Sequence, residues 1–397
     1  MTILQRILIV DDDALITEGL AAVLECRGRE IVVCSTIEAA QLVVERMPID
    51  CVITDVRLTG PFRNEGLEFI GDVKRCLPHC IVILITGAPS DQLTREARNR
   101  GAAAVLAKPF EVTRIEELIS APLSGDEPRL TLVPAIDDIV GSGRLAPFFQ
   151  PVIELTGGDT VYGFEALARF ETDSMFHFPD ALFAYANRAG RIADMELACI
   201  RATFARCAPL AASGAKIFIN VHPALIGSAR LLTALDQIVA TSNVPAAQIV
   251  LEITEQESLG EARDVARQCA ALRARGFAFA LDDVGIAYSH LSHIDAIAPK
   301  YLKVSQEFGG SFERDATKTK IVRNVLSLAR DFDCQLVLEG VETASTRDAA
   351  RDEGITLAQG YFFGRPAPIA AISVAARRMQ RKPRSGDLCV APRVSVG

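Results

Sequence analysis

The sequence predicts a mixed α/β protein in which a doubly wound parallel sheet precedes a (β/α) barrel. The chain has 397 residues, which is long enough for two domains. Its first part alternates short apolar runs with helical patterns, and its second part contains seven strand-like runs that each end in an acidic or hydrogen-bonding residue. The expected boundaries are 1–120 for the first domain, 121–146 for a linker, 147–378 for the second domain and 379–397 for a flexible tail.

Five β-rich runs make up the first domain, and helical segments such as 14–28 lie between them. Strands that alternate with helices predict a five-stranded parallel sheet of the flavodoxin-like kind, with helices on both faces. The runs are RILIV (6–10), IVVC (31–34), CVIT (51–54), IVILIT (81–86) and AAVLA (103–107).

Polar residues follow these runs at the place where ligands of such sheets bind, outside the carboxyl ends of the strands. Three adjacent aspartates could be no more than the first turn of a helix, and a single later aspartate could be a turn residue. Together, the polar residues predict an acidic Mg²⁺ pocket beside a phosphorylatable carboxylate, in which a lysine neutralises the phosphoryl group and a hydroxyl senses it. These residues are Asp11, Asp12, Asp13, Asp55, Thr86 and Lys108.

Residues 5–120 resemble the receiver domain of bacterial two-component response regulators, in the stretches ILIVDDDALI, VITDVRL, ILITG and LAKPF. The resemblance implies that Asp55 accepts phosphate from a histidine kinase or phosphotransfer protein. It also implies that Asp11 and Asp12 bind Mg²⁺ together with the carbonyl of Arg57, and that Thr86 and Lys108 form the switch.

Two features depart from the receiver pattern. The stretch TGPFRNEG (59–66) is longer than the usual loop after the phospho-acceptor, and Val105 stands where most receivers carry an aromatic switch residue. Signalling through the usual pair of a threonine and an aromatic ring is therefore not expected.

The runs of the second domain end in carboxylates, amides and one lysine. Polar groups at the carboxyl ends of successive strands are how a (β/α) barrel gathers its catalytic groups on one face. Five carboxylates and an asparagine on one site would repel each other unless divalent cations neutralised them, so the pattern predicts a metal-dependent enzyme. The residues are Glu165, Asn220, Glu252, Asp282, Asp283, Lys303, Glu339 and Gln359.

From residue 148 to about 370 the chain resembles the EAL domain family of cyclic di-GMP phosphodiesterases. The tripeptide at 165–167 is weak evidence alone, but it is accompanied in order by INVHP, LEITE, LDDVG, LKVS, LEGVET and QGYFFGRP. The resemblance implies a TIM-like (β/α)8 barrel with an antiparallel first strand. It also implies hydrolysis of cyclic di-GMP to the linear dinucleotide pGpG with Mg²⁺ or Mn²⁺, by two ions that clamp an in-line displacement.

The same resemblance assigns roles to single residues, each matched to a family motif. Lys303 would orient the attacking water, Arg169 would contact a substrate phosphate, and Glu255 would brace the loop after Asp283. Gln150 would lie near the guanine end of the substrate, and Gln359 beside the metal ions. The implied ligands of the ions are Glu165, Asn220, Glu252, Asp282, Asp283 and Glu339.

Departures in the barrel leave two other functions open. The family loop DDFGTGYSS reads DDVGIAYSH here, which changes Val284, Ile286 and Ala287, and Ser305 replaces an aspartate of the family. One alternative is a barrel that binds cyclic di-GMP with little or no turnover and acts as a regulated receptor. The other is an adaptor that only binds proteins, and the intact carboxylate set argues against it because the carboxylates repel without an ion.

Bulk properties limit the remaining functions. The net charge of −8 gives no broad attraction to nucleic acid, and residues 121–146 contain no helix-turn-helix candidate, so direct DNA binding is not expected. Ten cysteines without a CxxC pair, no signal peptide and no apolar stretch of membrane-spanning length predict a cytoplasmic protein without a membrane segment. The resemblance adds a homodimer, and we expect phosphorylation of Asp55 to control the output of the barrel.

Overall fold

The computed structural model describes residues 5–26, 28–58, 64–110, 112–119, 129–171, 179–254, 262–284 and 291–372. The chain divides into two compact units, and it passes from one to the other three times. Unit 1 contains residues 1–144 and 170–195, and unit 2 contains residues 145–169 and 196–397. Among the described residues, no helix has both the length and the apolar character that crossing a membrane requires.

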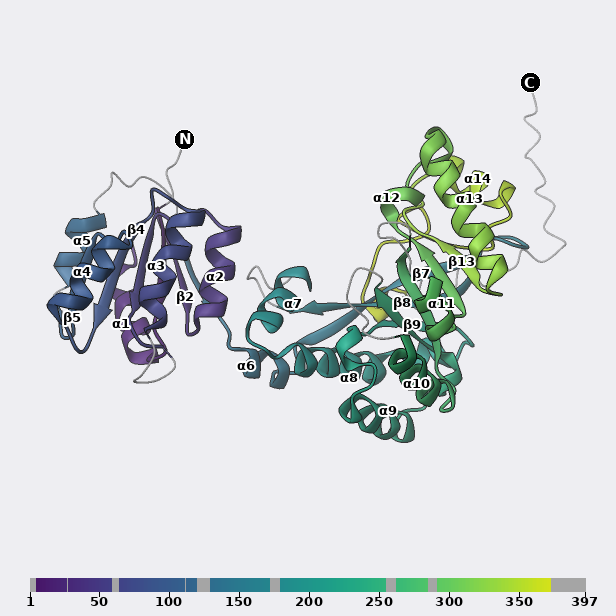
Figure 1. The fold of residues 1–397 in the computed structure, drawn as a ribbon, viewed down its shortest axis with the longest axis horizontal. Coiled ribbons are helices and arrows are strands. Elements are labelled where there is room, and N and C mark those ends of the chain that lie inside the picture. The colour runs from purple at the N-terminus through teal and green to yellow at the C-terminus, as the bar shows by residue number, and fades with distance from the viewer. Residues whose placement is uncertain are drawn as a thin grey trace, which may run out of the picture. The chain divides into compact units, whose positions relative to one another are not determined.

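Unit 1 contains a parallel sheet with the strand order β5-β4-β3-β1-β2-β6 (Figure 1). The five expected strands are all present, which confirms the doubly wound fold. The strands are β1 (Gln5–Val10), β2 (Arg29–Cys34), β3 (Cys51–Asp55), β4 (Ile81–Thr86), β5 (Ala104–Ala107) and β6 (Arg129–Val133). The helices are α1 (Ala14–Leu24), α2 (Ile37–Arg46), α3 (Glu65–Cys76), α4 (Asp91–Asn99), α5 (Val112–Ile119), α6 (Ile136–Gly141) and α7 (Pro179–Arg188).

The sixth strand, β6, comes from the segment expected to be a linker. It pairs in parallel with β2, so that Val33 lies opposite Leu132 and Cys34 opposite Val133. Val133 is 7% exposed, whereas Leu132 is 61% exposed, because alternate residues of a strand point to opposite faces. Strand β6 therefore extends the sheet at its edge and contributes one buried side chain next to β2.

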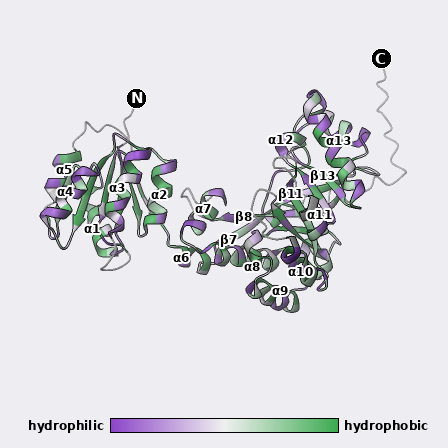
Figure 2. Ribbon diagram, in the orientation of Figure 1, coloured by the Kyte–Doolittle hydropathy of each residue, from purple (hydrophilic) through white to green (hydrophobic). Residues whose placement is uncertain are grey.

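The core of unit 1 forms because the strands are apolar on both faces, as Figure 2 shows by their hydrophobic colouring. On one face, isoleucines and valines of β1 to β4 pack against α1 and α5, through residues such as Leu20 and Ile115. On the other face, α2 and α3 bury residues such as Val43 and Phe69. Parallel strands covered on both sides place their carboxyl ends at one edge, where a ligand site can form.

Unit 2 contains a closed eight-stranded barrel with the order β10-β11-β12-β13-β14-β7-β8-β9. Strand β7 pairs antiparallel with β14, and the pairs from β8 through β9 and on to β14 are parallel, which confirms the expected antiparallel first strand. The strands are β7 (Leu145–Glu154), β8 (Thr160–Phe170), β9 (Lys216–Asn220), β10 (Ile249–Thr254), β11 (Ala278–Val284), β12 (Tyr301–Val304), β13 (Gln335–Leu338) and β14 (Leu357–Gln359).

Helices between the barrel strands bury one apolar side each. They are α8 (Ile192–Ala211), α9 (Ala229–Thr241), α10 (Ala262–Arg273), α11 (Leu291–Ile297), α12 (Gln306–Gly309), α13 (Ala316–Asp331) and α14 (Ala344–Asp352). Inside the barrel, Phe218, Val250, Tyr301 and Val337 belong to one buried cluster. These apolar side chains fill the interior of the barrel. The polar residues lie at the carboxyl ends of the strands, where sites form in barrels of this kind.

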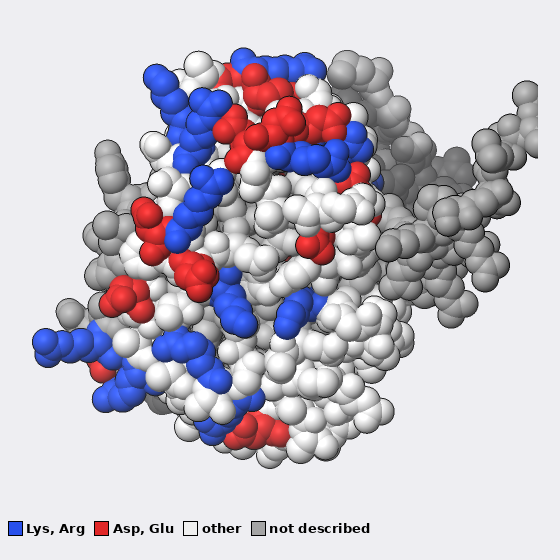
Figure 3. All heavy atoms as spheres, turned by 90° about the vertical axis from the view of Figure 1, so that its right-hand side faces the viewer, with Lys and Arg blue, Asp and Glu red and all other residues white. Residues whose placement is uncertain are grey.

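The charged surface of unit 2 is mixed. On the face shown in Figure 3, lysine and arginine side chains alternate with aspartate and glutamate side chains. Ion pairs also join charges on the surface of unit 2, such as Arg351 with Asp159 at 2.7 Å and with Asp348 at 3.4 Å. An interspersed surface of this kind provides no continuous basic stripe on that face for a nucleic-acid backbone.

Candidate functional site

A lysine at the carboxyl end of β12 lies at the centre of the barrel site. Lys303 is 1% exposed. Its Nζ atom lies 2.8 Å from Glu339, 3.0 Å from Glu252, 3.4 Å from Asp282 and 3.5 Å from Glu165. Burial alone would lower the pKa of Lys303, but the four carboxylates raise it well above its ordinary value. The amine is therefore held as a cation among the acids.

The acidic residues differ in protonation because their neighbours differ. Burial tends to raise the pKa of Glu165, but Lys303 and the amides of Gln359 and Asn220 lower it below its ordinary value. Burial raises the pKa of Glu252 well above its usual range. Burial also raises the pKa of Glu339, to about 8. One positive charge is thus too little to keep all the carboxylates ionised.

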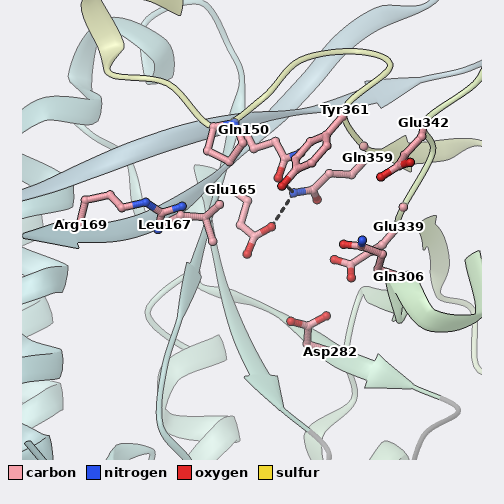
Figure 4. Close-up of a pocket in the computed structure, with 13 residues that line it drawn as sticks. Gln150, Glu165, Leu167, Arg169, Asp282, Gln306, Glu339, Glu342, Gln359 and Tyr361 are labelled. Atoms are coloured by element: carbon pink, nitrogen blue, oxygen red, sulfur yellow. Dashed lines mark hydrogen bonds between the residues drawn. The ribbon is translucent and has the colours of Figure 1, made fainter. Parts of the chain in front are cut away.

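Amide side chains hold the position of Glu165. The Nε2 atom of Gln359 donates a hydrogen bond to Glu165 Oε2 at 2.5 Å and another to Gln150 Oε1 at 3.1 Å. The Nδ2 atom of Asn220 donates to Glu165 Oε1 at 3.3 Å. Figure 4 shows the carboxylates of Glu165, Asp282 and Glu339 directed toward a common space. Amides from two widely separated parts of the barrel sequence, those of Asn220 and Gln359, therefore hold one carboxylate.

The donor set fits a divalent cation. Glu252 is buried, and within the described part of the chain its carboxylate has the ion pair with Lys303 but no other hydrogen-bond partner. The carboxylate oxygens of Asp282, Asp283 and Glu339 lie within 4.8 Å of one another. Asp283 has a φ angle of 58°, in the left-handed region that a non-glycine residue adopts rarely. Oxygen atoms of carboxylates and amides are the ligands that Mg²⁺ and Mn²⁺ prefer.

A cavity of about 250 Å³ opens beside these groups. It is lined by Arg169 and Gln150 in addition to the carboxylates. The further lining residues that were not singled out from the sequence include Gln306, Glu342 and Tyr361. Glu342 lies in the LEGVET stretch and Tyr361 in QGYFFGRP, so those two motifs already contained the signal. Gln306 follows Ser305 and stands in no quoted motif.

Five barrel residues named from the sequence either lie outside the described residues or serve in packing or helix capping. Glu255, Ile286 and Ala287 lie outside the described residues. Val284 is 1% exposed and belongs to the core. Ser305 is 5% exposed, and its hydroxyl accepts a hydrogen bond from the amide of Glu307 at the start of α12. The serine therefore caps this short helix.

A second group of polar residues lies in unit 1, at the carboxyl ends of β1, β3 and β5. Lys108 Nζ lies 2.8 Å from both Asp11 Oδ2 and Asp55 Oδ1. Burial raises the pKa of Asp11, against the lowering effect of Lys108. The two carboxylates outweigh burial at Lys108 and raise its pKa. The backbone N–H of Arg57 donates to Asp55 Oδ2 at 2.8 Å.

Three other polar residues lie near these strand ends. Thr86 is buried at the end of β4, and its hydroxyl accepts from the backbone of Ala88. Asp12 is exposed, and Asp13 caps α1 by accepting from the amide of Leu15. The structure thus joins Asp11 and Asp55 through Lys108, and it places Thr86 at the end of β4 and Asp12 directly after Asp11.

Comparison with known proteins agrees with this geometry. Residues 135–366 match the EAL domain family, and residues 7–120 match the response regulator receiver domain. The chain is 26% identical over 338 residues to "Cyclic di-GMP phosphodiesterase RocR" of Pseudomonas aeruginosa, covering 81% of this chain and 85% of the relative. It is 30% identical over 231 residues to "Probable cyclic di-GMP phosphodiesterase PdeG" of Escherichia coli, covering 57% of this chain and 45% of the relative.

Solved structures show the same barrel fold. A structure titled "PaMucR Phosphodiesterase, c-di-GMP complex" superimposes with a TM-score of 0.55 at 22% identity, covering 60% of this chain and 97% of that one. An EAL domain protein from Listeria monocytogenes gives a TM-score of 0.55 at 22% identity, covering 61% and 96% of the two chains.

Proposed function

Because the chain belongs to the EAL domain family and carries a response regulator receiver domain before the barrel, we propose that it hydrolyses cyclic di-GMP to pGpG. The proposal includes control of this reaction by phosphorylation of Asp55. The observation that supports it best is the group of four carboxylates, two buried and two half-buried, around the buried Lys303 in a barrel. The relative RocR is named a cyclic di-GMP phosphodiesterase.

We assign the metal-binding role to the oxygen donors at the strand ends. When bound, Mg²⁺ or Mn²⁺ would lower the pKa of a coordinated water and neutralise the phosphoryl oxygens. The amides of Asn220 and Gln359 fix the carboxylate of Glu165 so that its oxygens face the cavity. The proposed ligands are Glu165, Asn220, Glu252, Asp282, Asp283 and Glu339.

The remaining residues act on water and substrate in this proposal. Lys303 orients the attacking water and, through its charge, holds the carboxylates together while ligands exchange. Arg169 lines the cavity and would bind a substrate phosphate, and Gln150 would contact the guanine end. Since a phosphodiester anion repels a nucleophile, the positive groups beside it lower the barrier for attack.

In the receiver, Asp55 is the proposed phospho-acceptor, and Asp11 and Asp12 are proposed to bind Mg²⁺ with the carbonyl of Arg57. A histidine kinase or phosphotransfer protein would donate the phosphate, and two chains would pair as a dimer. We further propose the division 1–120 for the receiver, 121–146 for a linker whose strand β6 completes the receiver sheet, 147–378 for the EAL domain and 379–397 for the tail.

The test is conversion of cyclic di-GMP to pGpG by the purified full chain with Mg²⁺ or Mn²⁺. We expect turnover that EDTA abolishes and that Glu165→Ala reduces by at least about a thousandfold, since removing a metal ligand removes the stabilised reacting geometry. The matched control is Glu154→Ala, the last residue of the neighbouring strand β7, which does not line the cavity and should leave turnover unchanged. Binding of cyclic di-GMP without turnover would overturn the enzyme and favour a receptor.

A further inference from the structure

Helix α7 joins the compact unit of the receiver, although in the chain it follows the barrel strand β8. It lies within residues 135–366, which match the EAL domain family, yet it belongs to unit 1. Two ion pairs connect it to α2: Arg46 Nη1 lies 2.6 Å from Asp180, and Arg188 Nη2 lies 2.5 Å from Glu45. Each helix contributes one acid and one base, so the two surfaces are complementary in charge.

Tyr185 is the buried anchor of this contact. The side chain is 1% exposed, and its hydroxyl lies 3.1 Å from Thr36 Oγ1. The backbone of Ile136, the first residue of α6, also hydrogen-bonds to this hydroxyl. Since partly exposed ion pairs contribute little stability, the buried phenol with its two partners determines whether α7 is held in this place.

Thr36 lies close in sequence to the phosphorylation pocket. The backbone N–H of Asp11 donates to the carbonyl of Cys34 at 3.2 Å, and Thr36 follows two residues later as the N-cap of α2. Asp11 itself contacts Lys108, which also contacts Asp55. Ion pairs and one hydrogen bond therefore connect the phospho-acceptor to Cys34, and two residues of chain connect Cys34 to Thr36, which holds Tyr185.

In the chain, α7 comes after strand β8, which carries residues of the proposed catalytic site. These residues are Glu165 and Arg169. A change in how firmly α7 is held would therefore act on the end of the strand that carries these two residues. The aromatic ring through which most receivers signal is absent, since Val105 stands in that position.

We infer that the surface of α2 around Thr36, Glu45 and Arg46 is the output surface of this receiver, and that its partner is the helix α7 of the same chain. Phosphorylation of Asp55 changes the contact between Thr36 and Tyr185, and through α7 it changes the position of the end of β8 that carries Glu165 and Arg169. This inference rests on the phosphorylation control in the proposed function and names the element that transmits it.

The experiment is hydrogen–deuterium exchange of the full chain with Mg²⁺, with and without beryllofluoride as the phosphoryl analogue. We expect exchange in α7 to change about fivefold or more on addition of beryllofluoride, the lower range of ordinary allosteric coupling. In Tyr185→Phe and in Thr36→Val the change should fall below about twofold. The matched control Tyr162→Phe removes a tyrosine hydroxyl that bonds to Tyr301 instead, and it should keep the full response.

Turnover of cyclic di-GMP provides a second readout. The ratio of turnover with beryllofluoride to turnover without it should approach one in Tyr185→Phe, whatever the basal turnover of this variant. The single charge reversals Arg46→Asp and Asp180→Arg should weaken the response, and the double variant should restore it. This restoration would show that the two residues act through their mutual ion pair and not independently of each other.

The outcomes separate this inference from the proposed function. Changed exchange around Asp55 with unchanged exchange in α7 overturns the α2–α7 route and leaves phosphorylation control intact. No change anywhere in unit 1 overturns both. A chain without turnover whose α7 still responds overturns the enzyme alone and supports the output surface.

Discussion

At the scale of single residues, the positive charge of Lys303 neutralises part of the negative charge of the four surrounding carboxylates, which bound metal ions would otherwise neutralise. Its ammonium is the cation within 3.5 Å of all four carboxylates. Removing one partner of a buried ion pair costs about 3–5 kcal/mol, because the remaining charges stay buried. The lysine therefore stabilises the barrel before any ligand binds.

The first prediction follows from that role. Lys303→Met should lower the thermal midpoint strongly in EDTA, and Mn²⁺ should restore a large part of the loss because the ions neutralise the same carboxylates. Thermal unfolding followed by circular dichroism with and without Mn²⁺ measures both effects. The control Lys300→Met changes an exposed lysine of the same segment and should leave the midpoint unchanged. Equal stability of Lys303→Met and the parent chain in EDTA would contradict the prediction.

A second residue-scale prediction concerns pH. Burial raises the pKa of Glu339 to about 8 from an ordinary value near 4.5. Between these values the folded metal-free chain holds a proton that the unfolded chain has lost, so this group makes stability fall as pH rises through that window. A metal ligand must be deprotonated, so Mn²⁺ affinity should rise about tenfold per pH unit up to pH 8 and then level off.

Isothermal titration calorimetry at several pH values between about 6 and 9 measures this dependence. Glu339→Gln cannot ionise at this position, and it should bind Mn²⁺ more weakly with a flatter pH profile. An affinity for Mn²⁺ that stays constant from pH 6 to pH 8 in the parent chain would show that Glu339 is already ionised there.

At the scale of elements, helix α3 contains two glycines with opposite requirements. A Cβ atom on Gly66 would lie 1.8 Å from the carbonyl oxygen of Asp55, whereas a Cβ atom on Gly71 would meet no atom within 4 Å. Gly66→Ala should displace the strand end that carries the phospho-acceptor and abolish beryllofluoride binding. Gly71→Ala should stabilise the chain by about 0.5–1 kcal/mol, because alanine favours a helix over glycine.

Thermal unfolding and a beryllofluoride titration followed by isothermal titration calorimetry distinguish the two variants. Normal beryllofluoride binding by Gly66→Ala would show that the start of α3 can move away from Asp55 without cost to the pocket.

Strand β6 contains two neighbouring residues, one buried and one exposed, at which the same substitution can be compared. Val133 is buried beside Cys34, while its neighbour Leu132 is exposed. Val133→Asp should destabilise unit 1 by about 2 kcal/mol or more, since it buries a carboxylate without a partner, and Leu132→Asp should be nearly neutral. Differential scanning calorimetry compares the two. Equal midpoints would mean that β6 adds nothing to the stability of the sheet.

The same elements show what the sequence could and could not predict. The strand ends around Lys303 were predictable because a buried strand is an apolar run and its polar end residue is then conspicuous. Strand β6 was not predictable, since RLTLV is a short run in a segment rich in proline, glycine and serine, and only the open edge of β2 makes it a strand. The membership of α7 in unit 1 depends on Tyr185 and Thr36, which are far apart in sequence.

At the scale of the whole molecule, the two units are not consecutive segments of the chain. The boundaries at 144, 169 and 195 mean that unit 1 takes α7 from within the EAL match. A chain that keeps only the barrel sequence therefore contains a helix whose buried tyrosine has lost its partner. Cutting this protein at the end of the receiver should therefore destabilise the remaining chain more than the same cut would in a protein whose domains are joined only by a linker.

This leads to a prediction that uses one substitution in two chains. In the full chain, Tyr185→Phe should cost about 1 kcal/mol, because it removes a buried hydroxyl and leaves Thr36 without that partner. In a chain that begins at residue 145, the same substitution should cost almost nothing, since both Thr36 and Ile136 are gone and the phenol is exposed. Urea unfolding of the four proteins, followed by circular dichroism, gives the two differences. If Tyr185→Phe costs the same in both chains, the hydroxyl has its partner within the barrel sequence, and α7 does not depend on the receiver.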